Sequence, residues 1–423
     1  MRIMIHGMNY APEFSGVGRY TEEIALHLAE LGHKVCVVTA PPHYPAWRVE
    51  EGYSASSWRR ELAKGVEIYR CPIYLAKEMR GLKRALASLS FALSSAPVVL
   101  WQALRRRPHV VLSVEPTLFG APFALMAGRL VGARLVLQVQ DLEVDAAFAM
   151  GHLKGRTLAT AARHFERVIR RSFDQIITIS NRMAERIVAN GAKAERVAIV
   201  RNWVDVVKIR PLNRQSAYRS ELGLANDAFV ALYSGALGAK QGVGLLVEAA
   251  RNLMGHENII LVIAGDGPMR GLLEAAAEEL PNLTILPFQP EERFGEFLAL
   301  ADVHLMPQEM NAADLMLPSK LGGMLASGKP IIVTAAKDTE LAEFLGDAAA
   351  RVEPNDARLF AKAILDLAVD PNADQYVDQR LRLARKISKP VCLRSFVAAL
   401  LPNAPKGDDE GFGPNVNPQT DRT

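Results

Sequence analysis

The chain has 423 residues, which is too long for one ordinary hydrophobic core, so we expect two domains of about 150–200 residues each. Hydrophobic residues make up 49% and charged residues 23%, which excludes a disordered or fibrous chain. The net charge of +4 is too small to indicate nucleic-acid binding by itself. Cys36, Cys71 and Cys392 form no CxxC pair, which argues against a structural zinc site and fits a reducing compartment.

The first 40 residues predict a strand, a helix and a second strand. Residues 2–8 are a short apolar run, residues 17–31 have apolar side chains at helical spacing, and residues 34–39 are apolar again. No signal-peptide pattern precedes the first strand, so we expect a cytoplasmic protein. Gly16 and Gly18 stand where the helix begins and would let a ligand's phosphate or sugar approach the main chain. A plain strand-to-helix loop fits the same residues.

Residues 75–108 combine apolar and basic side chains without a clean spanning pattern. Serines and Pro97 make residues 85–104 a poor membrane-spanning helix, and Pro97 is expected to break the segment into two helices. Basic residues beside apolar helices that carry tryptophan suit an anionic membrane surface. The alternative is two core helices with solvated basic ends. The residues expected at an acceptor or membrane surface are Arg84, Trp101, Arg105, Arg106 and Arg107.

The remainder of the first half alternates strands and helices. The predicted strands are residues 110–114, 135–139, 175–179 and 197–200. The strand 135–139 delivers three carboxylates, Asp141, Glu143 and Asp145, at its carboxyl end, where an α/β active site would lie. A solvated, helix-capping loop is the alternative.

A composition change at residues 208–213 indicates an interdomain linker, and a second series of alternating strands and helices follows. Its predicted strands are residues 229–233, 259–264, 283–286, 303–306, 331–334 and 349–352. Glycine-rich turns, residues 235–244 and 265–268, follow the first two strands. Such turns let a phosphate approach the backbone and a helix N-terminus, so we predict an anionic nucleotide here, with ordinary βα turns as the alternative. No GxGxxG follows a strand with an acidic residue further on, which disfavours a nicotinamide oxidoreductase.

Several ordered segments together resemble the retaining GT-B glycosyltransferases of family 4, which use nucleotide-sugar donors. The opening YAPEFSGVGRYTEEIALHLAELGHKVCVVT is similar to that family's amino-terminal signature. The other similar segments are residues 200–205, the diphosphate-type loop 235–242, the turn 265–268, and the donor-type motif 318–321 with 325–330. Within the family the likeness is closest to the WcaI-like enzymes of colanic acid biosynthesis.

The resemblance implies an α/β fold of the GT-B kind, with two Rossmann-like doubly wound parallel-sheet domains facing a central cleft. Residues 1–207 would form the acceptor-side domain, with a helix near 375–403 packing back on it. Residues 208–374 would bind the donor, and residues 404–423 would be a disordered tail. The implied reaction moves a sugar, with retention, from a nucleotide-sugar to a lipid-linked or polysaccharide acceptor in exopolysaccharide synthesis. The alternatives are a non-catalytic nucleotide-binding subunit and a nucleotide-sugar epimerase of the same fold.

The resemblance also implies roles for particular residues, with neither a metal nor a cofactor beyond the nucleotide-sugar substrate. The expected partners are the nucleotide-sugar, a lipid-linked saccharide acceptor and an anionic membrane surface, without nucleic acid. The catalytic candidates are Asp141, Lys240 and Asp314. The donor-binding candidates are Gly16, Gly18, Gly235, Gly238, Lys240, Gly265, Gly267, Phe288, Pro318, Ser319 and Lys320.

Two positions depart from the family pattern. The second of the family's two glutamates falls on Gly323 when counted back from residues 326–330, or on Gly322 when counted forward from Asp314. A glycine stands at either place, so no side chain there can contact the ribose. Gln140 occupies the place where many members carry a histidine, and the sugar-facing role is therefore expected to pass to Gln140, Asp141 or Glu143, of which Asp141 is favoured.

Overall fold

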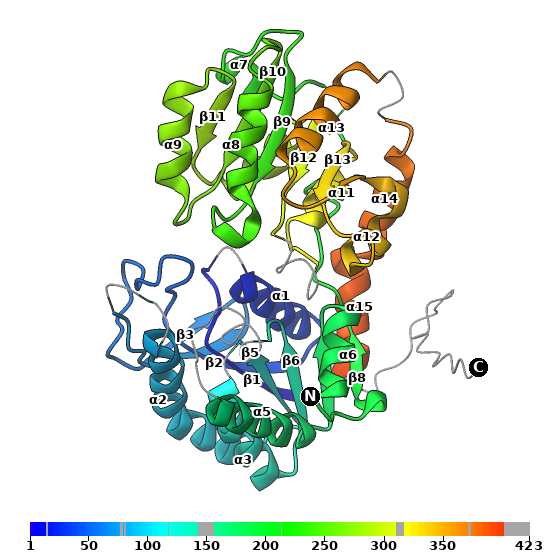
Figure 1. The fold of residues 1–423 in the computed structure, drawn as a ribbon. Coiled ribbons are helices and arrows are strands. Elements are labelled where there is room, and N and C mark those ends of the chain that lie inside the picture. The colour runs from blue at the N-terminus through cyan, green and yellow to red at the C-terminus, as the bar shows by residue number, and fades with distance from the viewer. Residues whose placement is uncertain are drawn as a thin grey trace, which may run out of the picture. The chain divides into compact units, whose positions relative to one another are not determined.

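The structure is a computed structural model that describes residues 1–13, 16–76, 79, 82–116, 118–142, 156–212, 214–309, 317–370 and 374–401. It divides into two compact units (Figure 1). Unit 1 comprises Met1–Ile179, Met183–Val200 and the chain from Leu393 onward, and unit 2 comprises Ser180–Arg182 and Arg201–Cys392. Apart from Ser180–Arg182, the chain passes from unit 1 to unit 2 after Val200, whereas the expected boundary was at 207. The tail expected at 404–423 lies outside the described residues.

Unit 1 is built on an eight-stranded sheet with the order β3-β4-β2-β1-β5-β6-β7-β8. Every neighbouring pair is parallel except the β3–β4 hairpin. Strand order reverses between β1 and β5, the switch point at which doubly wound sheets bind ligands. The strands are β1 (Arg2–Gly7), β2 (Lys34–Thr39), β3 (Arg59–Ala63), β4 (Val66–Arg70), β5 (Val110–Glu115), β6 (Arg134–Val139), β7 (Gln175–Thr178) and β8 (Val197–Ile199). The helices are α1 (Gly16–Glu30), α2 (Leu82–Arg106), α3 (Ala121–Val131), α5 (Arg156–Arg171) and α6 (Asn181–Ala189).

Unit 2 has a wholly parallel six-stranded sheet with the order β11-β10-β9-β12-β13-β14, which reverses between β9 and β12. Its central strands are apolar and buried because helices cover both faces of such a sheet. The strands are β9 (Phe229–Ser234), β10 (Ile259–Ala264), β11 (Leu283–Leu286), β12 (Val303–Met306), β13 (Ile331–Thr334) and β14 (Ala350–Val352). The helices are α7 (Tyr218–Glu221), α8 (Val243–Asn252), α9 (Arg270–Glu279), α10 (Phe294–Leu298), α11 (Leu321–Ser327), α12 (Glu340–Leu345), α13 (Ala357–Val369) and α14 (Val377–Lys386).

The expected break at Pro97 is wrong, because α2 runs without interruption from Leu82 to Arg106. Proline removes one N–H from the helical ladder and pushes nearby carbonyls outward, so a helix continues only where those carbonyls find other donors. The Ser94 carbonyl, one turn before the proline, accepts a hydrogen bond of 3.1 Å from the Trp58 indole nitrogen. Trp58 immediately precedes the β3–β4 hairpin, an element that the sequence reasoning did not predict.

The chain returns to unit 1 at its carboxyl end. Helix α15 (Lys389–Leu400) follows α14, and its residues from Leu393 belong to unit 1. The Arg134 guanidinium at the start of β6 donates a 3.3 Å hydrogen bond to the carbonyl of Ala399. The last helix is thereby tied to the sheet of unit 1.

Candidate functional site

Two glycine-rich turns are joined at the carboxyl edge of the unit 2 sheet. The N–H of Gly235, just after β9, donates to the Ala264 carbonyl at the end of β10, at 2.9 Å. Leu237 donates to the Asp266 carbonyl and accepts from the Met269 N–H, both at 2.9 Å. The turns after β9 and β10 are thus one hydrogen-bonded assembly at the switch point, not two independent loops.

The crossing of these turns explains two of the predicted donor-binding glycines. A Cβ on Gly265 would lie 1.8 Å from the Gly235 carbonyl oxygen, and a Cβ on Gly267 would lie 2.6 Å from the Leu237 carbonyl oxygen. Neither position has room for any side chain. The packing of backbone on backbone is therefore sufficient reason for both glycines, and their contact with a donor stays a prediction.

Lys320 lies against this assembly with an unpaired, buried amino group. Its Nζ is 3.9 Å from the centroid of the Tyr233 ring, and a Cβ on Gly235 would meet its Cδ at 3.4 Å. Among the described residues, Nζ has neither solvent exposure nor a hydrogen-bond partner. Burial lowers the pKa of Lys320 from 10.5 to about 7. A buried cation with no acid beside it favours the arrival of an anion, because the anion would supply the missing charge partner.

Lys240 is placed differently from Lys320. It lies in the single 3-10 turn Ala239–Gln241, and its side chain is exposed to solvent. Gly238 directly precedes that turn, and the Lys240 carbonyl accepts a 3.2 Å hydrogen bond from the Glu309 N–H. Both cations of the prediction belong to unit 2, but only Lys320 is fixed against the glycine turn by burial.

The other predicted donor-side residues flank the same edge of the sheet. Pro318 is half-buried and Ser319 is exposed, and both directly precede Lys320. Phe288 is half-buried just beyond the end of β11. Its neighbour Gln289 is held by the Tyr218 hydroxyl, which donates to Oε1 at 2.9 Å. This hydrogen bond fixes the segment that the resemblance assigns to the nucleotide base.

The glycines that replace the family's glutamate face packed apolar side chains. A Cβ on Gly322 would lie 2.9 Å from the Val204 Cβ, and one on Gly323 would lie 3.0 Å from a methyl group of Leu298. All residues of α11 are buried. Packed side chains therefore leave no space for a ligand at either position. Asp314, the candidate to stand in for the family's first glutamate, lies outside the described residues.

In unit 1, a buried carboxylate organises the loop that carries Gly16 and Gly18. Glu13 Oε1 accepts from the backbone N–H groups of His43 and Tyr44, each at 3.1 Å. Its other oxygen accepts from the Asn9 side-chain amide at 2.9 Å. A Cβ on Gly18 would lie 2.6 Å from that oxygen, so Gly18 makes room for Glu13. Burial raises the pKa of Glu13 to about 7. The sequence reasoning gave Glu13 no role.

A second buried acid lies at the carboxyl end of β5, across the switch point from that loop. Glu115 accepts a 3.3 Å hydrogen bond from Arg170, which also pairs with Glu166 at 2.8 Å. The pKa of Glu115 is raised to about 7, chiefly by burial; Arg170 lowers it, and the nearby Glu166 and Asp141 carboxylates raise it. The predicted Asp141 is half-buried and lies near this group, whereas Glu143 and Asp145 lie outside the described residues. Gln140, which takes the place of the family's histidine, is buried.

The predicted basic group of α2 is only partly available at the surface. Arg106 is not a free surface charge: it pairs with Glu67 at 2.5 Å and donates to Gln102 at 2.7 Å. Arg84 donates to the Met79 carbonyl at 2.9 Å and stacks over Trp47. Arg105, Arg107 and Trp101 are exposed. The assignment of these residues to an acceptor or membrane surface stays a prediction, and Arg106 offers less free charge there because Glu67 on β4 pairs with it.

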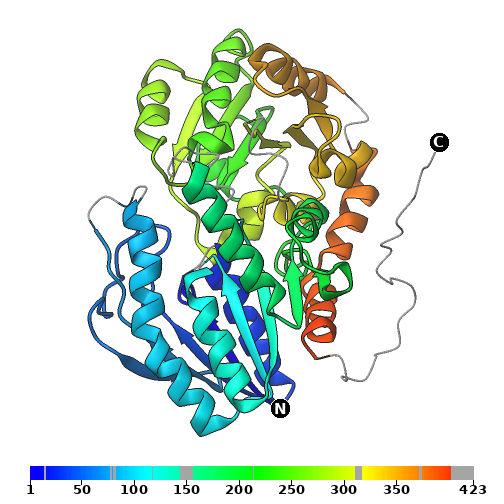
Figure 2. The same cartoon turned by 60° about the horizontal axis from the view of Figure 1, so that its bottom comes forward.

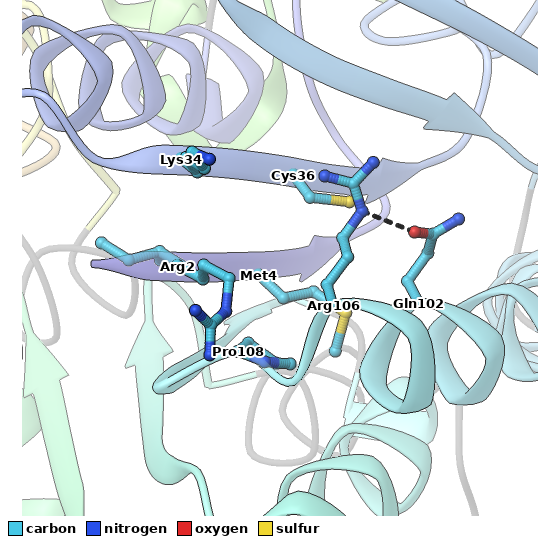
Figure 3. A pocket seen from close by; sticks show the side chains of 8 residues that line it. Arg2, Met4, Lys34, Cys36, Gln102, Arg106 and Pro108 are labelled. Carbon is cyan, nitrogen blue, oxygen red and sulfur yellow. Dashed lines mark hydrogen bonds between the residues drawn. The ribbon is translucent and has the colours of Figure 1, made fainter.

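A small pocket lies at the opposite, amino-terminal end of the unit 1 strands (Figure 3). Its lining includes Arg2, Met4, Lys34, Cys36, Gln102 and Arg106. Ligands of doubly wound sheets bind beyond the carboxyl ends of the strands, so this pocket is on the wrong edge to join the candidate site. Within the described ranges, no group of three or more His, Cys, Asp or Glu side chains is placed to hold a metal ion.

Two sequence families match the two halves of the chain. Residues 15–203 match the family described as glycosyl transferase 4-like domain, and residues 228–370 match glycosyl transferases group 1. The putative colanic acid biosynthesis glycosyl transferase WcaI of Escherichia coli K12 is 37% identical over 407 residues. That alignment covers 94% of this chain and 99% of WcaI.

Solved structures share the fold at low sequence identity. HepE of Anabaena, solved with UDP-glucose, superposes with a TM-score of 0.68 at 14% identity and covers 96% of this chain and 100% of its own. WaaG, a glycosyltransferase of lipopolysaccharide biosynthesis, gives a TM-score of 0.66 at 17% identity, covering 94% and 99%. These likenesses show the fold that the two doubly wound sheets form.

Proposed function

Because the chain belongs to the glycosyltransferase family with a glycosyl transferase 4-like half and a group 1 half, we propose that it transfers a hexose, with retention, from a UDP-sugar to a lipid-linked saccharide. The family establishes glycosyl transfer. The likeness to WcaI supports a cell-surface polysaccharide of the colanic acid type as the product. The UDP-glucose bound to HepE supports uridine as the base of the donor.

The observation that carries the donor site is the buried amino group of Lys320 beside the crossed turns of unit 2, which has no hydrogen-bond partner in the part of the chain that the structure describes. In glycosyl transfer the sugar–phosphate bond breaks and the nucleoside diphosphate gains negative charge. A cation that is already desolvated and held in place stabilises this charge without further reorganisation. Lys320 would act there as an ammonium group over the Tyr233 ring, and Lys240 would join it as a solvent-exposed second cation.

The acceptor would bind to unit 1, at the switch point between β1 and β5. Gly16 and Gly18 line the first loop, and Glu13 holds that loop to the segment after β2. Asp141 and Glu115 provide carboxylates near the same edge, which suit sugar hydroxyl groups. In the retaining reaction that the resemblance implies, the donor phosphate takes the acceptor's proton, so these groups would orient the acceptor and would not act as the base. Asp314, the remaining catalytic candidate, lies outside the described residues.

A lipid-linked acceptor places the enzyme at a membrane, and we propose the cytoplasmic face of the plasma membrane. Support comes from exposed Trp101 and Arg105 on α2 and from the absence of acidic residues over most of the surrounding sequence. Among the residues with defined placement, α2 is long and apolar enough to cross a membrane by length and composition alone.

The proposal is tested first by thermal unfolding in the presence of UDP, GDP, ADP or NAD. A ligand at about 100 times its dissociation constant stabilises a folded protein by about 2.7 kcal/mol, which is readily seen as a shift. A shift with UDP alone, followed by release of UDP from a UDP-hexose only when a polyprenyl-linked saccharide is added, is the expected result. Stabilisation by UDP without turnover on any acceptor would instead identify a non-catalytic nucleotide-binding protein. Epimerisation of the donor without acceptor would identify an epimerase.

A further inference from the structure

The outward face of α2 is an uninterrupted apolar stripe. Leu93 is 58% exposed, Trp101 62% and Leu104 58%, and these residues follow one another at helical spacing. The stripe begins one turn after Lys83 and ends beside Arg105. Its members are Leu86, Leu89, Leu93, Pro97, Trp101 and Leu104. Single exposed leucines are ordinary on a soluble protein. A stripe along five turns of one helix is a contiguous apolar patch, which is typical of a surface that binds a partner or a membrane.

The neighbouring helix also exposes apolar side chains. Helices α2 and α3 pack against each other and lie side by side along unit 1 (Figure 2). On α3 and the turn before it, Phe119, Met126 and Leu130 are exposed, Leu130 by 60%. Two adjacent helices therefore both present apolar side chains to the outside, and we call the six residues of α2 together with Phe119, Met126 and Leu130 the apolar face.

The charges around the apolar face are of one sign. From Met79 to Gln140 the only carboxylate in the sequence is Glu115, which is buried in the ion pair with Arg170. Basic residues mark the rim, with Lys83 at the start of α2, Arg105 at its end and Arg129 on α3, all of them exposed. An apolar centre with a mainly basic rim, at which Glu67 is paired with Arg106, matches the acyl and phosphate layers of an anionic lipid leaflet.

The packing of α2 fixes its orientation to such a leaflet. Its inward side, with Ala87, Phe91, Val99 and Ala103 fully buried, contacts the sheet and α3 along its length. A helix that covers a sheet on one side cannot also cross a bilayer. Basic residues at both ends of α2 also favour a helix that lies flat, because both ends then reach the phosphates of the same leaflet.

We propose that unit 1 inserts the apolar face of α2 and α3 into the acyl region of one anionic leaflet, so that apolar contacts, and not the arginines, provide most of the membrane affinity. This inference deepens the proposed function by naming how the enzyme reaches a lipid-linked acceptor. Because Arg106 is already paired with Glu67, few charges remain for purely electrostatic attachment. Apolar insertion persists at high salt, whereas attraction between charges is screened.

The test compares variants of the full chain in co-sedimentation with vesicles of phosphatidylcholine and phosphatidylglycerol. The first variant combines Leu93→Gln, Trp101→Gln and Leu104→Gln, which removes apolar surface without changing charge. The control variant carries Met254→Gln, Leu272→Gln and Val369→Gln, three comparably exposed apolar residues of unit 2. A third variant carries Lys83→Gln and Arg105→Gln. Unaltered melting midpoints and unaltered UDP binding establish that each variant is folded.

The proposal predicts that wild type and control bind vesicles equally, and that this binding survives about 0.5 M NaCl. The first variant should bind at least about a hundredfold more weakly, since each buried apolar side chain contributes on the order of tenfold. The third variant should lose only the salt-sensitive part. Binding that vanishes at high salt, or that the first variant retains, would overturn the proposal. A wild-type dimer that the first variant converts to monomer, with no vesicle binding by either, would assign the face to a second copy of the chain. Vesicle binding requires no turnover, so this result is independent of the proposed activity.

Discussion

Replacing Lys320 by methionine should make the ligand-free protein more stable while removing its response to nucleotide. Methionine keeps an apolar chain against Tyr233 and Gly235 but carries no amino group to desolvate. Lowering the pKa from 10.5 to about 7 corresponds to roughly 4 to 5 kcal/mol of cost for holding the protonated lysine in the folded state. The variant should recover a sizeable part of that cost at neutral pH.

The stability of the wild type should depend on pH because the pKa of Lys320 differs between the folded and unfolded protein. Lysine has a depressed pKa in the folded protein, so between about pH 7 and 10.5 the unfolded chain binds more protons than the folded chain. Stability of the wild type should therefore rise with pH across this window, by up to about 1.4 kcal/mol per pH unit. In Lys320→Met that rise should disappear, because no amino group remains to titrate.

The assay is urea unfolding at pH 7 and pH 9.5, with and without UDP. Lys240→Ala is the matched control: the exposed lysine should leave ligand-free stability unaltered, while donor turnover falls about tenfold or more through the lost charge contact. A Lys320→Met protein that is less stable than wild type at pH 7 would show that an acid pairs with Nζ. A variant that UDP stabilises as well as it does the wild type would remove Lys320 from the diphosphate site.

Three further outcomes test the packing. Gly265→Ala should cost more than about 3 kcal/mol, since its Cβ would collide with the Gly235 carbonyl oxygen, and a near-normal urea midpoint would mean that the crossed turns can separate. Because the pKa of Glu13 is raised to about 7, the folded wild type binds one more proton than the unfolded chain between about pH 4.5 and 7, and its stability falls as pH rises. Glu13→Gln should remove this fall. An unchanged pH profile of stability would contradict the burial argument. Pro97→Ala should raise stability by about 1–3 kcal/mol, because α2 is continuous through this exposed position, and a loss would show that the proline is needed for the Trp58 contact.

The strands of both sheets were predictable because each is a nearly continuous apolar run bounded by turn residues. The β3–β4 hairpin was not, since its first strand, Arg59–Ala63, lies at the sheet edge with mostly exposed polar residues and has no apolar pattern. The break expected at Pro97 failed because the rule describes an isolated helix, whereas here a distant tryptophan supplies a donor beside the proline. Local patterns therefore predicted the elements, and contacts between distant residues decided the exceptions.

In the candidate site too, local patterns predicted which residues to consider, and contacts between distant residues decided how those residues are placed. The glycine turns were predicted from their places after the strands, and both lysines from the family resemblance, but the relative importance of the two lysines could not be predicted. Whether a lysine is exposed, as Lys240 is, or has a buried amino group without a partner among the described residues, as Lys320 has, depends on which side chains the fold brings to it. Glu13 had no signal in the sequence beyond its place within the glycine loop. Its role follows from three donors, two of which come from the segment about 30 residues later.

The departure at Gly322 and Gly323 bears on how the donor is held. A carboxylate side chain at either position would have to displace Val204 or Leu298, so on the register that the resemblance implies, packing would fill this part of the family's site. The binding energy that the lost ribose contact supplied must then come from elsewhere. A desolvated lysine at the start of the same helix can supply it through the diphosphate, because charge interactions strengthen when water is excluded. On this reasoning the donor is held mainly by its diphosphate, and ribose should contribute little. Inorganic pyrophosphate should therefore retain a larger share of the affinity of UDP here than in relatives that keep the glutamate, and a pyrophosphate affinity negligible beside that of UDP would show that the ribose or base is held by residues still to be found.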